Sequence, residues 1–109
     1  MDHVPPSTSD AFKTFFSEAP EHAQAFMAMV RQCAAASALD AKTSELAYLA
    51  VLAAIGRVSG VAFHVQQAKA AGASRSEIIS AILVGLPAAG LGVTAALPAA
   101  IAAFDEEPA

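Results

Sequence analysis

The chain has 109 residues, enough for one domain with a single core, and its net charge is −4 from ten acids and six bases. No basic run occurs, so the charge pattern excludes nucleic acid as a partner. Hydrophobic residues make up 56% and charged residues 15%, more apolar surface than so small a domain can bury, which indicates self-association or a membrane.

The N-terminal part is predicted to contain a lead-in and one short helix. Residues 1–10 hold two prolines and several hydroxyl residues, which is typical of a flexible segment before a single domain over 11–104. Ser9 or Asp10 is a candidate N-cap for a helix that carries three rings on one side, Phe12, Phe15 and Phe16.

A second helix is predicted to begin at Pro20 and to run to about Ser37, because proline suits the first helical turn. Cys33 lies on its apolar stripe and is interpreted as a small core residue. A single cysteine cannot form an intramolecular disulfide, and no signal-peptide pattern opens the chain, so a cytoplasmic setting is expected.

Two further helices are predicted in the middle of the chain. Asp40 can cap a helix that runs to Ile55, and Gly56 offers a break after it. A fourth helix is expected over about 59–71, followed by Gly72.

The C-terminal third begins with a capping box, in which Ser74 and Glu77 open a fifth helix. The run from Ile78 to Phe104 has no charged residue and no histidine, and its length alone would suit a membrane span. Its glycines and prolines favour two shorter helices with a turn near Gly90 in the core of an oligomer, while residues 105–109 read as an acidic tail.

Glu45 and His64 form the constellation with the best potential for chemistry. They are 19 residues apart on successive predicted helices joined by a short break, and short connections favour antiparallel packing. The two side chains are therefore expected to meet. In the competing interpretation, Glu45 is an acid in an early turn that interacts favourably with the helix dipole, and His64 is a hydrogen-bonded core residue.

Arg57 and Tyr48 are candidates to line the same site and to bind substrate. Arg57 precedes His64 by two helical turns, and Tyr48 follows Glu45 by three residues. The competing interpretation of Arg57 is a solvated cation at a helix start. The three histidines are scattered and no acidic cluster has ligand spacing, so neither a metal nor a cofactor is predicted.

Three segments, LDAKTSELAYLAV, AFHVQQAKAAGAS and SEII, carry a resemblance that covers about residues 39–85. The sequence resembles the carboxymuconolactone decarboxylase family, which includes the alkylhydroperoxidase D-like proteins. The resemblance implies an all-α helical bundle of about six helices that forms trimers or hexamers through apolar helix faces.

The resemblance also frames the chemistry. Peroxidase members carry a CxxC pair seven and four residues before the histidine, where this chain has Arg57 and Gly60. Decarboxylase members do without that pair, which implies His64 as acid or base, Glu45 orienting it and Arg57 holding a substrate carboxylate.

Three functions are consistent with these residues. The first is a cofactor-free lyase that acts on a small carboxylated lactone and uses His64. The second is a redox-inactive binding or structural oligomer. The third is a single-thiol peroxidase in which Cys33 replaces the missing pair.

Overall fold

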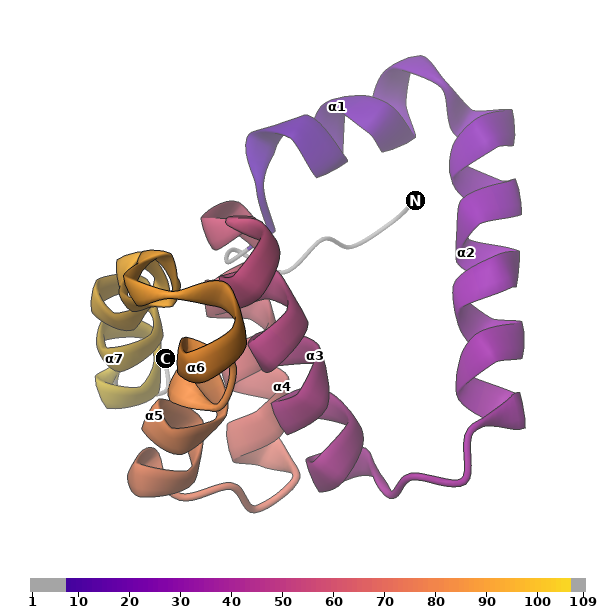
Figure 1. Ribbon diagram of the computed structural model, residues 1–109. Coiled ribbons are helices and arrows are strands. Elements are labelled where there is room, and N and C mark those ends of the chain that lie inside the picture. Colours follow the sequence, from indigo (N-terminus) through magenta and orange to yellow (C-terminus); the bar gives the residue numbers. More distant parts are fainter. Residues whose placement is uncertain (1–7, 107–109) are drawn as a thin grey trace. The chain divides into compact units, whose positions relative to one another are not determined.

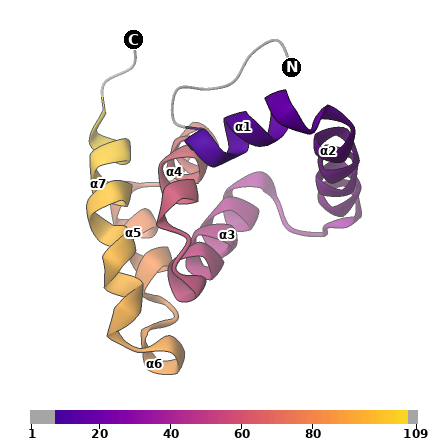
Figure 2. The same ribbon diagram turned by 90° about the horizontal axis from the view of Figure 1, so that it is seen from above.

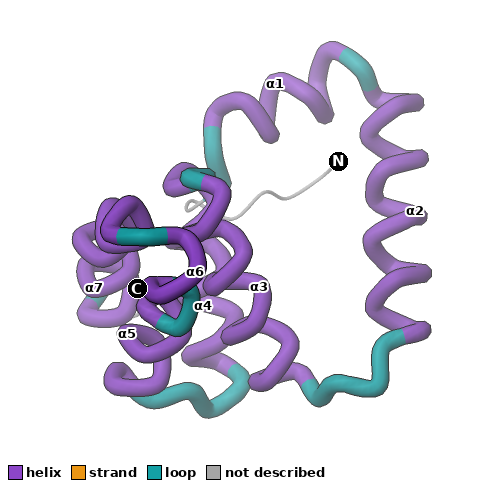
Figure 3. Tube along the Cα trace, viewed as in Figure 1, coloured by secondary structure: helices purple, strands orange, loops and turns teal. Residues whose placement is uncertain are grey.

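The computed structural model describes residues 8–106, and these residues form helices and loops without any strand (Figure 3). The all-α prediction is confirmed. The contacts divide the chain into two compact units, one ending at Asp40 and one beginning at Ala41. Most of the predicted lead-in and the last three residues of the predicted tail lie outside the described residues.

The first unit contains α1 (Asp10–Glu18) and α2 (Pro20–Ala36). Ser9 caps α1 as predicted, because its Oγ accepts a hydrogen bond of 3.3 Å from the Phe12 N–H. The rings of the two helices form one cluster, with Phe12 and Phe26 edge to face at 6.0 Å between centroids. Aromatic packing therefore joins α1 to α2.

Cys33 differs from its predicted place in the core. The residue is exposed on α2, and its Sγ lies 3.7 Å from the Sδ of Met29 one turn earlier. Ala23 is the one buried residue of this helix. The apolar stripe of α2 was identified correctly as a pattern, but periodicity does not show whether a partner element covers a stripe.

The second unit is a bundle of four longer helices with short helical segments between them (Figure 1). The longer helices are α3 (Ala41–Ile55), α4 (Val61–Ala70), α5 (Arg75–Leu83) and α7 (Leu97–Asp105). The short segments are the 3₁₀ turn η1 (Val58–Gly60), α6 (Leu86–Ala89) and the 3₁₀ segment η2 (Leu91–Ala96). The largest fully buried side chains all lie here: Leu49, Ile78, Ile82, Val61, Val65 and Val93.

Local signals in the sequence set several of these boundaries. The capping box before α5 is present, with the Ser74 Oγ accepting from the Glu77 N–H at 3.1 Å and a Glu77 Oε1 accepting from the Ser74 N–H at 2.8 Å. Lys42 of α3 also bonds the Glu77 carboxylate at 2.8 Å, and this contact lowers the pKa of Glu77. The start of α5 is thus tied to the start of α3.

The uncharged C-terminal run is divided as expected. Gly90 adopts φ +83°, a left-handed conformation that suits glycine, and it separates α6 from η2. Within the described part of the chain, no helix is both long enough and apolar enough to cross a membrane.

Side chains from α4 and α5 hold the end of α7, and Figure 2 shows these three helices side by side. The Lys69 Nζ donates to the Phe104 carbonyl at 2.7 Å, and the Gln66 Nε2 donates to the Ala103 carbonyl at 2.9 Å. Arg75 bonds both carboxylate oxygens of Asp105, at 3.0 and 3.2 Å. Asp105 is therefore the last residue of α7 rather than the start of the tail.

Replacing Asp105 with Asn is expected to make the folded state less sensitive to acid. Hydrogen bonding to Arg75 holds the pKa of the Asp105 carboxyl below its usual value. A lowered pKa stabilises the folded state above the unfolded value of about 4, and that stabilisation is lost as pH falls through the folded value. Melting temperatures measured from about pH 7 to about pH 2 should fall less steeply below pH 4 for Asp105→Asn. Arg75→Gln is the matched control and should flatten the curve similarly, whereas identical curves for wild type and Asp105→Asn would contradict the expectation.

Candidate functional site

Glu45 and His64 meet across the pair formed by α3 and α4. The start of α3 lies beside the later part of α4, as antiparallel helices joined by a short connection must. The His64 Nδ1 lies 2.9 Å from Glu45 Oε1 and 3.3 Å from Oε2. Both side chains are about one-fifth exposed, at 22% and 21%. The prediction that these two side chains meet is confirmed.

The contact fixes which nitrogen of His64 is free. An ionised carboxylate only accepts hydrogen bonds, so the Nδ1 that faces Glu45 must carry a proton. The neutral ring then has its lone pair on Nε2, and the protonated ring has its second N–H there. The pair can therefore take up or release a proton at Nε2 while the bond to Glu45 persists.

Two aromatic rings flank the imidazole of His64. The Tyr48 ring stacks on it, with centroids 4.2 Å apart and planes 28° apart. Phe63 meets it edge to face, at 5.1 Å and 83°. The structure thus brings together three of the four predicted site residues, Glu45, Tyr48 and His64.

Arg57 lies in the connection between α3 and α4 rather than on either helix. It is exposed and directly precedes η1, and among the described residues its side chain has no hydrogen bond or ion pair. The helical offset between Arg57 and His64 does not apply, because α4 begins only at Val61. A role for Arg57 in binding substrate stays a prediction.

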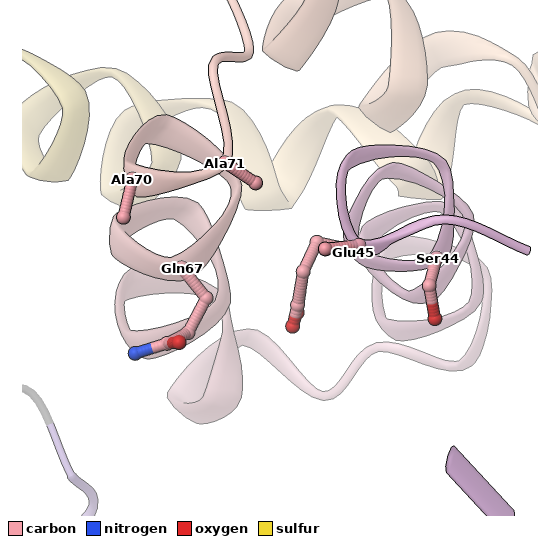
Figure 4. A pocket seen from close by; sticks show the side chains of 6 residues that line it. Ser44, Glu45, Gln67, Ala70 and Ala71 are labelled. Atoms are coloured by element: carbon pink, nitrogen blue, oxygen red, sulfur yellow. The ribbon is translucent and has the colours of Figure 1, made fainter. Parts of the chain in front are cut away.

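A shallow, open hollow of about 400 Å³ lies between the start of α3 and the end of α4 (Figure 4). Glu45 forms part of its wall, so the hollow adjoins the Glu45–His64 pair. The lining carries one carboxylate, one hydroxyl and one amide among small side chains: Ala41, Ser44, Glu45, Gln67, Ala70 and Ala71. No cation is among these lining residues.

Ser44 and Gln67 were not predicted as site residues, although both offer polar groups to the hollow. Spacing gives a signal for Gln67, since it follows His64 by three residues and so shares a helix face with it. Ser44 has no such signal. Its place depends on how α3 packs against α4, which periodicity does not determine.

Comparison with known proteins assigns this sequence to a family. The model of the carboxymuconolactone decarboxylase family matches residues 20–106. The chain belongs to this family. Searches of curated proteins and of solved structures return no significant match.

The family match spans all of α2 and the whole bundle, so it crosses the boundary between the two units at Asp40. It therefore covers every predicted site residue of this carboxymuconolactone decarboxylase family member. The resemblance recognised from the sequence is confirmed.

Proposed function

We propose that this family member is a cofactor-free lyase that acts on a small carboxylated lactone, with His64 as the acid or base. The observation that supports the proposal best is the 2.9 Å hydrogen bond between Glu45 and His64. It holds one nitrogen of the imidazole and leaves the other for proton transfer to and from a substrate.

The proposed reaction breaks the bond between a ring carbon and the substrate carboxylate. Carbon dioxide leaves, and the electron pair of that bond passes to a carbanion conjugated with the lactone carbonyl. The His64 imidazolium donates its Nε2 proton to this carbanion and becomes neutral, and a proton from water restores it. Glu45 stabilises the imidazolium throughout, as a charge-assisted hydrogen bond does.

Two places at opposite ends of the α3–α4 pair are candidates for substrate binding in this proposal: the hollow at one end and Arg57 at the other, with Tyr48 beside His64. The hollow offers the Ser44 hydroxyl and the Gln67 amide for hydrogen bonds to a lactone. A substrate carboxylate requires a positive charge, and a substrate bound at the other end of the pair would find it in the exposed guanidinium of Arg57. Tyr48, half exposed beside His64, contacts the substrate.

Replacing His64 with Ala is expected to lower kcat on carboxylated lactones about 10²- to 10⁴-fold, the usual contribution of a general acid or base. Carbon dioxide release from a panel of such lactones is the measurement. His22→Ala is the matched control, because His22 is an exposed histidine of α2, and it should keep wild-type turnover. Unchanged turnover in His64→Ala would remove His64 from the mechanism.

In the same assay Arg57→Gln should raise KM about tenfold or more with little change in kcat, because it removes the charge that binds the substrate carboxylate.

We also propose that the protein is a homo-oligomer, a trimer or a hexamer. Two large apolar side chains of α3 lie one helical turn apart and are exposed by 55% and 62%: Val51 and Ile55. A second copy of the chain would bury such a stripe. The same property fits the alternative of a redox-inactive structural oligomer.

Sedimentation equilibrium tests the assembly. Wild type should have three or six times the 11.0 kDa mass of one chain. Val51→Glu should shift the mass towards the single chain, because it places a charge on the apolar stripe. Ser80→Glu adds the same charge at an exposed polar position of α5 and should leave the mass unchanged. A wild-type mass of 11.0 kDa would contradict the proposal.

A single-thiol peroxidase is the alternative enzyme, favoured by the exposure of the Cys33 thiol in the reducing, cytoplasmic setting that the lone cysteine suggests. Arg57 and Gly60 occupy the two positions of the peroxidase cysteine pair, so no second thiol is present to resolve an oxidised Cys33. Thiol-dependent reduction of an organic hydroperoxide is therefore expected to be absent, both in wild type and in Cys33→Ser. Turnover in wild type that Cys33→Ser loses would favour the peroxidase over the lyase.

A further inference from the structure

The stacked ring of Tyr48 restricts the tilt of the His64 imidazole, which the carboxylate of Glu45 does not. The Glu45 bond holds the imidazole at one atom, Nδ1, and a bond at one atom leaves the ring free to tilt about it. The Tyr48 ring lies across the face of the imidazole, 4.2 Å away and 28° from parallel, and so restricts that tilt. The two contacts are complementary.

Both contacts come from one helix. Glu45 and Tyr48 are three residues apart on α3, so they lie one turn apart on the same side of the helix. The ring of Phe63 closes a further side of the imidazole, edge to face. Tyr48 remains 49% exposed, so its burial contributes little to the core, and its ring stacks on His64.

We propose that Tyr48 is a positioning residue that acts through its ring: stacking holds the plane of the His64 imidazole, keeps Nδ1 on Glu45 and so keeps Nε2 as the reactive nitrogen. This inference rests on the proposed function, because a fixed Nε2 matters only if His64 transfers a proton. It differs from contact between Tyr48 and the substrate, since the ring suffices and the hydroxyl is not needed.

The test reads the tautomer of His64 directly and needs no substrate. In ¹⁵N-labelled full-length protein above the pH at which the imidazole titrates, two-bond correlations between ring protons and nitrogens distinguish Nδ1–H from Nε2–H. Signals of His64 are assigned by their loss in His64→Gln. His22, which is exposed on α2, is the internal reference for an unrestrained ring.

In wild type, the Nδ1–H form should predominate at His64 but not at His22. Tyr48→Leu should lower the ratio of Nδ1–H to Nε2–H at His64 about two- to tenfold, the range that loss of one aromatic pair allows. Tyr48→Phe, which keeps the ring, should keep the wild-type ratio. Tyr48→Gln is a second variant without a ring that suits a half-exposed position, and circular dichroism checks that each variant is folded.

Three results would overturn the inference. They are a wild-type ratio at His64 equal to that at His22, a ratio that neither Tyr48→Leu nor Tyr48→Gln changes, and an equal loss in Tyr48→Phe, which would assign the effect to the hydroxyl. Failure of the proposed function looks different, because a protein without lyase turnover would still show the tautomer restrained by Tyr48. If the wild-type protein turns over lactones but the tautomer ratio of His64 does not change in the Tyr48 variants, only the positioning role is refuted.

Discussion

The antiparallel packing of α3 against α4 is the constraint on which the site depends. Leu49, Val61 and Val65 are fully buried there, and each such side chain contributes about 1.5–3 kcal/mol. A hydrogen bond to a charged group adds about the same or less, so apolar packing positions the Glu45–His64 pair and the pair does not hold the helices together. The reversal between the helices uses Gly56 at φ +76°, a conformation that other residues rarely adopt.

The two faces of α4 contact different helices. His64 and Gln67 lie on the side that meets α3 and the hollow. Gln66 and Lys69 point to the end of α7, where they donate to carbonyl oxygens that the helix leaves unpaired. The last turn of α7 has no basic residue of its own, so cations and donors from α4 and α5 take that part. These hydrogen bonds attach α4, the helix that carries His64, to the end of α7.

Capping and proline signals in the sequence predicted the helices well, and the sequence predicted the candidate site in part. The capping box at Ser74 and the proline that opens α2 set helix starts through bonds within a few residues, so a short window is enough to recognise them. Glu45 and His64 were predicted to meet because a short connection leaves few ways to pack two helices. The place of Arg57 could not be predicted from its offset to His64, because that offset assumes one continuous helix, and the exposure of Cys33 depends on which surface covers α2.

The partial exposure of the Glu45–His64 pair suits a proton-transfer site better than full burial would. Complete burial of two charges costs several kcal/mol for each ion, which favours their neutral forms and reduces their use as acid and base. With about one-fifth of each side chain exposed, water solvates the pair in the free protein. In the proposed reaction, a substrate that fills the hollow would displace this water and lower the local dielectric, which would strengthen the attraction between Glu45 and a protonated His64. Under that proposal, electrostatic stabilisation of the imidazolium would be strongest when the substrate is bound beside the pair.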